Sequence, residues 1–160
     1  MIAVVQLTDK ANVSFDYKKN EITNGFVVLL GIIEGDTTED VYKLVDKLIY
    51  LRTFERDGKF FEVSIKDVKG EILVVSQFTL GANFKKGRRP DFSDAMSPKD
   101  AEILYNEFVS LLKDQNLPVK TGKFGAYMNV RLNNTGPVTY IIDSRELWLK
   151  KWLYLYFQLH

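Results

Sequence analysis

The sequence predicts a single α+β domain, and three observations lead to that class. The 160 residues contain 46% hydrophobic side chains, enough for one core of ordinary size. About six segments have the apolar or alternating pattern of strands, and two have the spacing of amphipathic helices. These segments do not alternate strictly, as they would in a parallel βαβ fold. No linker, repeat or low-complexity segment divides the chain.

Three strands are expected in the first part of the chain. Residues 2–7 form one, and Val13 with Phe15 fits a second that turns back at residues 18–20. Residues 26–33 are the longest unbroken apolar run and predict a buried strand. This run is too short to cross a bilayer, and no basic leader with a cleavage site is recognisable at the N-terminus. Neither a membrane span nor secretion is therefore expected.

Two helices are predicted from their start signals and apolar spacing. Asp36, with Glu39 three residues later, indicates the first helix start. The apolar face that follows consists of Val41, Leu44, Val45 and Leu48. Ser97 can cap a second helix, because Pro98 takes its first position and Asp100 lies in its first turn. Its apolar residues are Ala101, Leu104, Tyr105, Phe108, Leu111 and Leu112.

The remaining strands contain the polar positions that call for an explanation. Residues 71–80 predict a buried strand whose C-terminal half is polar. Alternation from Ala126 to Leu132 predicts a strand with two different faces, and residues 138–142 predict another. Polar residues that close an apolar run, and a Gly-Pro pair that opens one, are typical of a functional site.

Composition excludes several kinds of chemistry. The chain has no cysteine, so disulfides, thiolate metal sites and thiol nucleophiles are absent. The only histidine is His160, the last residue, which leaves no Ser-His pair and no histidine metal site. Twenty-two basic residues nearly balance 21 acidic ones, so any RNA contact must be a local patch. An enzyme built this way would act on an already reactive bond through positioning and backbone donors.

Two motifs give the chain a family resemblance. The first motif is Ser76-Gln77-Phe78-Thr79-Leu80, which is followed by Gly81-Ala82 and the block from Lys85 to Phe92. The second motif is the segment from Asn134 to Thr139. Together they resemble D-aminoacyl-tRNA deacylases (D-tyrosyl-tRNA deacylases), from Met1 to about Glu146. The resemblance implies a strongly curved, barrel-like, mostly antiparallel sheet with two helices packed outside, in a homodimer. It also implies a cytoplasmic hydrolase that cleaves the ester between a D-amino acid and tRNA without a metal or organic cofactor.

The resemblance assigns catalytic positions to the first motif. It implies that Ser76 to Thr79 form the site, with the N–H groups of Gln77 and Phe78 around the reacting carbonyl. In this family Thr79 matches a residue considered as the nucleophile. No base in the sequence can take its proton, so attack by water, assisted by the ribose 2′-hydroxyl of the substrate, is the alternative. By themselves, Ser76 and Gln77 can equally satisfy hydrogen bonds at a strand end.

The second motif is expected to read handedness. Taken alone, Gly136-Pro137 is an ordinary trans turn into a strand. The resemblance implies a cis bond, and a loop that reaches into the partner's site and excludes the side chain of an L-amino acid. Met128 and Ala101 match positions that line the same pocket, although single apolar residues are more often plain core. Leu7 follows Gln6 where the family usually has an arginine that helps to hold this loop.

Two further segments carry predictions. One is a run of four cations within five residues, Lys85, Lys86, Arg88 and Arg89. Such a run is often only a solvated loop. Because it directly follows the first motif, contact with the tRNA backbone is favoured. Residues 147–160 form an apolar extension beyond the usual family end. It is expected to pack on its own subunit or across a dimer interface, and contact with a membrane surface is the less favoured alternative.

Two rival interpretations stay open from the sequence. One is a non-catalytic RNA-binding dimer that uses the basic loop and exposed aromatic residues. The other is a structural dimer that has kept the motifs without the activity. The preferred D-amino acids, and the extent to which glycine is also removed, are not determined by the sequence.

Overall fold

The computed structural model describes residues 1–148, so most of the predicted extension at 147–160 lies outside the described residues. Within residues 1–148 the strands are β1 (Ile2–Phe15), β2 (Lys18–Ile22), β3 (Gly25–Gly31), β4 (Phe54–Arg56), β5 (Lys59–Val63), β6 (Glu71–Ser76), β7 (Val119–Thr121) and β8 (Asn129–Asp143). The α-helices there are α1 (Thr38–Tyr50), α2 (Ile65–Val68) and α3 (Pro98–Asp114), with 3₁₀ turns at Phe78–Gly81 and Ser144–Glu146. No helix in this range is long and apolar enough to cross a membrane.

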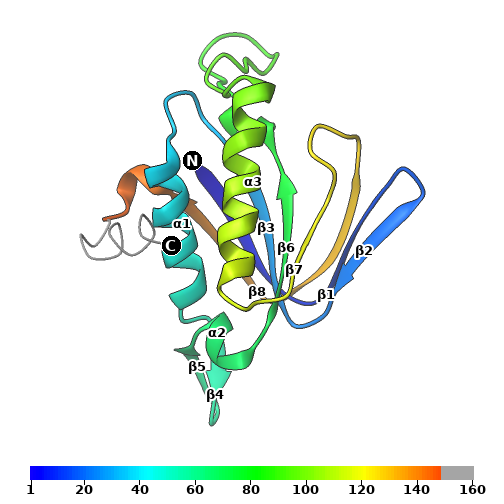
Figure 1. Cartoon of the computed structure of the whole chain (residues 1–160), viewed down its shortest axis with the longest axis vertical. Helices are drawn as coiled ribbons and strands as arrows, with labels where there is room; N and C mark the ends of the chain where they lie inside the picture. The colour runs from blue at the N-terminus through cyan, green and yellow to red at the C-terminus, as the bar shows by residue number, and fades with distance from the viewer. Residues whose placement is uncertain (149–160) are drawn as a thin grey trace.

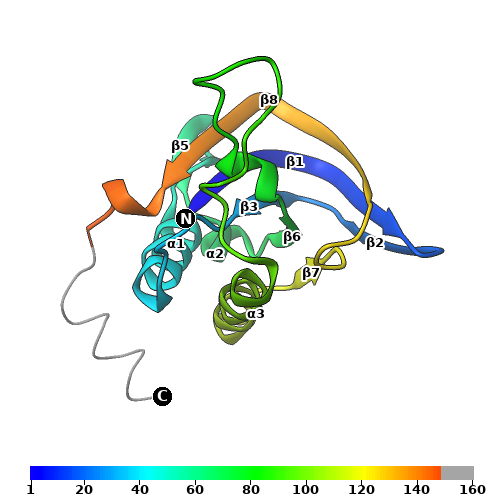
Figure 2. The same ribbon diagram turned by 90° about the horizontal axis from the view of Figure 1, so that it is seen from above.

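One six-stranded sheet organises the molecule (Figure 1). The order is β2-β1-β3-β6-β7, and β8 pairs with β1. Pairs that include β1 are antiparallel, whereas β3–β6 and β6–β7 are parallel. The predicted α+β class and barrel-like curvature are confirmed, and most pairs are antiparallel as expected, but the two parallel pairs make the sheet a mixed one. Figure 2 shows the sheet arching strongly, with α1 and α3 side by side on one face.

The first predicted pair of strands is one long strand. β1 runs unbroken from Ile2 to Phe15. Its register with β8 shifts twice, by a bulge of β8 between Gln6 and Thr8 and by an extra residue of β1 between Thr8 and Ala11. The chain then reverses at Asp16 and Tyr17, which both have positive φ, and not at residues 18–20 as expected. Lys18 and Lys19 already pair with Phe15 and Ser14 in β2.

The predicted helices are present, and α2 is an additional short one. Val41, Leu44, Val45 and Leu48 are fully buried on α1, as predicted. The helix start lies one residue later than expected, because the N–H of Thr37 donates to the Asp40 carboxylate at 2.9 Å. On α3, Ser97 Oγ accepts from the Asp100 N–H, which confirms the predicted cap. Leu111 is only partly buried on that helix.

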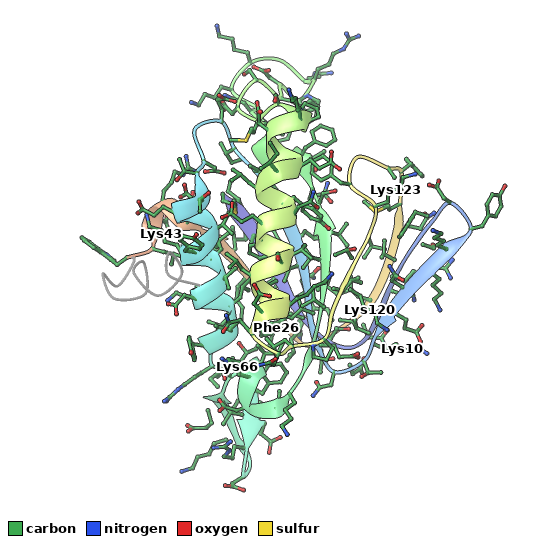
Figure 3. The ribbon with its side chains drawn as sticks, in the orientation of Figure 1. Lys10, Phe26, Lys43, Lys66, Lys120 and Lys123 are labelled. Atoms are coloured by element: carbon green, nitrogen blue, oxygen red, sulfur yellow. The ribbon has the colours of Figure 1, made fainter. Side chains whose placement is uncertain are left out.

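Two apolar clusters fill the two sides of the sheet. The larger lies between the sheet and the helices and includes Phe108 and Phe26, both fully buried; Phe26 is labelled in Figure 3. The smaller lies inside the curl of the sheet and joins Val13, Ile22 and Leu73, with Met128 and Val130 packed against it. Truncation of such a residue to alanine costs about 2–5 kcal/mol. The curl is therefore held by its own core.

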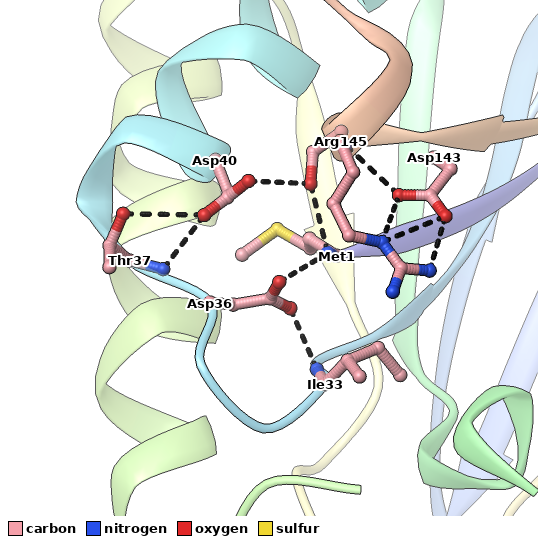
Figure 4. A network of polar contacts seen from close by, with 8 residues as sticks. Met1, Ile33, Asp36, Thr37, Asp40, Asp143 and Arg145 are labelled. Carbon is pink, nitrogen blue, oxygen red and sulfur yellow. Dashed lines mark hydrogen bonds and ion pairs between the residues drawn. The ribbon is translucent and has the colours of Figure 1, made fainter. Parts of the chain in front are cut away.

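A buried polar network ties the N-terminus to α1 and to the end of β8 (Figure 4). The Met1 ammonium donates to Asp36 Oδ1 at 2.5 Å and to Ser144 Oγ at 2.9 Å. Ser144 Oγ in turn donates to Asp40 Oδ1 at 2.7 Å. Asp36 was expected to start the helix; instead its carboxylate joins the N-terminus to the N–H of Ile33.

Candidate active site

The polar segment of the first motif lies where β6 leaves the sheet. β6 ends at Ser76, and residues 78–81 form a 3₁₀ turn, so the strand predicted for 71–80 is four residues shorter. The turn crosses the end of β3 at Gly31. A Cβ atom at Gly31 would lie 2.7 Å from Leu80 Cβ and 3.0 Å from the Gln77 carbonyl oxygen. The chain can therefore leave the sheet at the polar residues because Gly31, which has no side chain, lets the turn pass close to β3.

The hydrogen bonds of this turn leave two backbone donors unused. Gln77 N–H donates to the Leu30 carbonyl at 2.8 Å, and Gln77 Nε2 donates to Thr79 Oγ1 at 2.5 Å. The N–H groups of Phe78 and Thr79 have no acceptor among residues 1–148. The expected donor pair was Gln77 and Phe78. In the structure Gln77 N–H is committed to the sheet, and the donors available to a ligand are those of Phe78 and Thr79.

A pocket of about 640 Å³ opens beside this turn. Its floor comes from β3 and β6, and one wall comes from the start of α3, where Ala101 lies. Another wall is the loop before β8, with Met128 and Tyr127. Ser76, Gln77 and Phe78 complete the lining. The structure thus brings together five of the predicted residues, while Thr79 lies beside the pocket through its bond to Gln77.

Contacts of Tyr105 and Met128 fix the loop before β8. Tyr105 on α3 donates its hydroxyl to the Val74 carbonyl at 3.1 Å and packs its ring on Phe124, with 5.4 Å between centroids. Burial raises the pKa of the Tyr105 hydroxyl well above its ordinary value, so this donor stays protonated. The Lys123 N–H donates to Met128 Sδ at 3.3 Å and closes the loop. Ala126 and Met128 consequently precede β8 and are not part of it, unlike the prediction.

The chemistry that this lining permits is narrow. Of the described residues that line the pocket, only Tyr127 has an ionisable side chain. The other polar side chains there are those of Ser76, Gln77 and Ser97, and the unused N–H group of Phe78 belongs to a lining residue. No three carboxylate, histidine or cysteine side chains gather within residues 1–148 as metal ligands would. The pocket can hold a compact organic group and stabilise negative charge on an oxygen, but its lining supplies no strong base.

The Gly136-Pro137 pair lies on a bulge of β8, away from this pocket within the same chain. β8 is continuous, but Asn134 pairs with Thr8 and Thr139 pairs with Gln6, so the residues between them project from the ladder. The peptide bond before Pro137 is cis, as the resemblance implied. Both residues of the pair are exposed. The bulge is a feature of one strand and not a turn between two.

The bulge is held by Asn134. Its Oδ1 accepts from the Val138 N–H at 3.1 Å, and its Nδ2 donates to Thr139 Oγ1 at 2.7 Å. Gln6 Nε2 also donates to Thr139 Oγ1, at 3.3 Å. Leu7, which stands where an arginine was expected, packs against the main core. The side-chain support of the bulge therefore comes from two amides, Asn134 and Gln6, and the Thr139 hydroxyl.

The basic loop stands next to the pocket mouth. Backbone hydrogen bonds between Asn83 and Asp91 close the loop at its base. The next residue, Phe92, lines the pocket and packs on Phe78 with 5.0 Å between ring centroids. The exposed cations on the loop are Lys85, Lys86, Arg88 and Arg89. None of the four lines the pocket, so their place suits a ligand that extends outside it.

Sequence reasoning missed three aromatic residues of the pocket: Phe92, Phe124 and Tyr127. Phe92 closes the family-like block that begins at Lys85, which was a usable signal. Tyr127 lay in the outward phase of a predicted strand, and Phe124 lay in a loop. Their convergence depends on how α3 and the loop before β8 pack, which periodicity does not report.

The sequence is similar to those of known proteins over most of its length. A sequence model of the family described as D-Tyr-tRNA(Tyr) deacylase matches residues 4–143. A protein from Aquifex aeolicus (strain VF5) named D-aminoacyl-tRNA deacylase is 53% identical over 148 residues, covering 92% of this chain and 100% of the relative. A protein of the same name from Persephonella marina (strain DSM 14350 / EX-H1) is 49% identical with the same coverage.

Two solved structures share the fold. One, named c-Myc DNA Unwinding Element Binding Protein, has a TM-score of 0.83 and 42% identity over 89% of this chain and 98% of its own. The other, named as a probable eukaryotic D-amino acid tRNA deacylase, has a TM-score of 0.78 over 88% and 97% of the two chains. Its identity is 18%, so it supports the fold alone.

Proposed function

The chain belongs to the D-Tyr-tRNA(Tyr) deacylase family, and from that membership we infer that it hydrolyses the ester between a D-amino acid, such as D-tyrosine, and tRNA. It is a D-aminoacyl-tRNA deacylase, an enzyme that removes wrongly attached D-amino acids and returns the tRNA for use. The non-catalytic RNA-binding dimer is not favoured, because relatives named as enzymes match this chain over their full length.

The observation that supports a mechanism is the pocket with unused backbone donors and no base. The ester carbonyl oxygen accepts from the Phe78 and Thr79 N–H groups, which stabilise its negative charge as water attacks the carbon. A bond forms from the water oxygen to that carbon, the bond to the ribose oxygen breaks, and a water proton ends on the ribose oxygen. The neighbouring ribose 2′-hydroxyl relays the proton. This hydrolysis needs no metal or organic cofactor.

Selectivity in this proposal is steric and requires a homodimer. The exposed bulge at Gly136-Pro137 enters the partner's pocket and meets the side chain of an L-amino acid with its carbonyl groups. A D-side chain points the other way, towards open space. Glycine has no side chain to exclude and escapes the filter. Ala101 and Met128 then bound the space around the amino acid.

The basic loop positions the tRNA in this scheme. Lys85, Lys86, Arg88 and Arg89 contact phosphates of the acceptor end while the terminal adenosine enters the pocket. A substrate of this kind places the enzyme in the cytoplasm, where aminoacyl-tRNA is made and used.

Release of tyrosine from D-tyrosyl-tRNA and L-tyrosyl-tRNA tests the function directly. We expect release from the D-ester at a rate far above the spontaneous one and little release from the L-ester. Binding of both esters without release would overturn the activity. Sedimentation of the same sample tests the dimer, and a purely monomeric enzyme with full D-selectivity would overturn the shared site.

A further inference from the structure

A second hollow, which we call the tip site, lies at the tip of the β1–β2 hairpin. It has a volume of about 400 Å³ and is lined by Ser14, Phe15, Asp16, Tyr17, Lys18, Lys19, Tyr127 and Asn129. Tyr127 also lines the 640 Å³ pocket of the candidate active site, so this one residue belongs to the walls of both hollows. A ligand that fills the pocket and continues past Tyr127 therefore arrives at the tip site.

Tyr17 occupies a position that its local structure does not favour. The hairpin reverses at Asp16 with φ 45° and Tyr17 with φ 62°. Two-residue turns with positive φ at both positions prefer glycine at the second one, and a bulky residue there is an outlier. The Tyr17 side chain is 112% exposed, so packing does not compensate for this conformation. Backbone outliers of this kind concentrate at functional sites.

Tyr127 is exposed in the same way. Its side chain is 92% exposed at the boundary between the two hollows. Neither Tyr17 nor Tyr127 makes a hydrogen bond or ring contact with another of residues 1–148. Two uncovered aromatic faces at one hollow are suited to stacking on a planar ring.

The charges around the tip site favour an anionic ligand. Lys19 pairs with Glu21 at 2.8 Å, and Lys123 pairs with Asp16 at 2.5 Å; Figure 3 labels Lys123 near the hairpin. Lys18 has no carboxylate partner among the residues that the structure describes. The hollow thus has two tyrosine rings and an excess positive charge. Aromatic faces combined with cations are how proteins bind single-stranded nucleic acid.

We propose that the tip site binds the unpaired nucleotide that precedes the aminoacylated adenosine of tRNA. Its base stacks on the exposed ring of Tyr17, and its phosphate lies near Lys18 and Lys19. This inference rests on the proposed function, because the adenosine must occupy the pocket for the preceding nucleotide to pass Tyr127. The tip site and the basic loop then hold the acceptor end from two directions.

The decisive variant is Tyr17→Gly. Glycine suits the turn, so the variant should fold and melt at or above the temperature of the unchanged protein. We expect its KM for D-tyrosyl-tRNA to rise about 5- to 100-fold, which corresponds to one base that no longer stacks. Its hydrolysis of D-tyrosyl-adenosine, which lacks the preceding nucleotide, should stay unchanged. Tyr17→Phe keeps the ring and should restore the KM for D-tyrosyl-tRNA.

A matched control removes an exposed aromatic residue elsewhere. Phe60 on β5 is 70% exposed, and no residue of the β4–β5 hairpin lines either hollow. This hairpin lies apart from the β1–β2 hairpin in Figure 1, and Phe60→Ala should leave the hydrolysis of both substrates unchanged. An unchanged KM for D-tyrosyl-tRNA in Tyr17→Gly would overturn the proposal. An equal loss on D-tyrosyl-tRNA and D-tyrosyl-adenosine would also overturn it, since the effect would then lie in the pocket.

Equilibrium binding separates this proposal from the proposed function. The trinucleotide CCA should bind the unchanged protein more tightly than adenosine does, and Tyr17→Gly should remove most of that difference. Changing Lys18 and Lys19 to alanine should lower the slope of log affinity against log salt by about 0.7 for each phosphate that the protein no longer neutralises. If D-tyrosyl-tRNA is not hydrolysed at all, the proposed function fails even where CCA binding behaves as expected. Equal affinities for CCA and adenosine would overturn the tip site alone.

Discussion

The α-ammonium group of Met1 lies 2.5 Å from the carboxylate of Asp36, and both groups are almost wholly buried. Ser144 Oγ accepts a second hydrogen bond from the same ammonium. The pair joins the first residue of the chain to the loop before α1, and Ser144 connects both to the end of β8. Three segments that are distant in sequence are thus fixed by one buried ion pair.

Removing one partner of that pair should be strongly destabilising. Asp36→Asn would leave the buried ammonium without a counter-charge, and we expect a loss of about 3–5 kcal/mol of unfolding free energy. Glu39→Gln is the control, because the Glu39–Lys43 pair on α1 is largely exposed at the carboxylate and should contribute less than about 0.5 kcal/mol. Equal urea midpoints for the two variants would contradict the structural role of Asp36.

Stability should fall in acid, partly through Asp40. Burial of this carboxyl raises its pKa, but hydrogen bonds from Thr37 and Ser144 and the nearby N-terminal ammonium outweigh burial and hold the pKa below its ordinary value. Because the pKa of Asp40 is lower in the folded protein, its ionised form adds stability at pH values above its pKa in the unfolded chain, near 4. This stability is lost as the pH falls through the pKa of Asp40 in the folded protein. Denaturant melts of Asp40→Asn should therefore differ from the unchanged protein at pH 7 and converge with it in strong acid. A gap that stays constant with pH would argue against ionisation as the cause.

Thr79 is expected to position the turn without attacking the ester. Its hydroxyl accepts from Gln77 Nε2, and loss of one such bond corresponds to about a 2- to 10-fold effect. Thr79→Ala should therefore keep D-selective hydrolysis, and rapid quenching should trap no acyl-enzyme. A substrate whose terminal adenosine lacks the 2′-hydroxyl should slow turnover more than this variant does. A D-aminoacyl ester on Thr79, detected by mass spectrometry, would restore the nucleophile role.

Asn134 should control selectivity more than rate. Asn134→Ala removes the acceptor of Val138 N–H and the donor to Thr139 Oγ1, and it should cost about 1–3 kcal/mol of stability. A bulge held less firmly excludes the L-side chain less well, so the ratio of D- to L-tyrosyl-tRNA hydrolysis should fall. The neighbouring Asn133 is exposed, and its side chain makes no hydrogen bond within residues 1–148, so Asn133→Ala should preserve the ratio. Unchanged selectivity in Asn134→Ala would show that the bulge is supported by other contacts.

The basic loop should affect binding and not the chemical step. With Lys85, Lys86, Arg88 and Arg89 changed to alanine, we expect KM for D-tyrosyl-tRNA to rise roughly tenfold or more and its salt dependence to flatten, with kcat little affected. A control that removes as many exposed cations from the opposite end of the molecule changes Arg52, Arg56, Lys59 and Lys113. A loss of kcat at unchanged KM would contradict a role of the loop in binding tRNA.

The sequence alone determined those features whose physical cause is local. Helix α3 starts at Ser97-Pro98 because a cap and a proline act within one turn. The buried face of α1 follows from residue spacing, and the family follows from two short motifs that retain their order. Pairing partners, strand direction and the parallel β3–β6 contact are not encoded by periodicity, which is why the mixed sheet was not predicted.

Tertiary structure decided every feature that depends on distant partners. Asp36 does not cap α1, because its carboxylate pairs with the ammonium of Met1, 35 residues earlier in the chain. β6 stops at Ser76 because Gly31 of another strand lets the turn cross over it. Phe92, Phe124 and Tyr127 line one pocket because α3 and the loop before β8 pack beside β6. Local propensities are worth a few tenths of a kcal/mol to about 1 kcal/mol per residue. Leaving a buried ammonium unpaired or a core side chain exposed costs several kcal/mol, so the long-range contact wins where the two disagree.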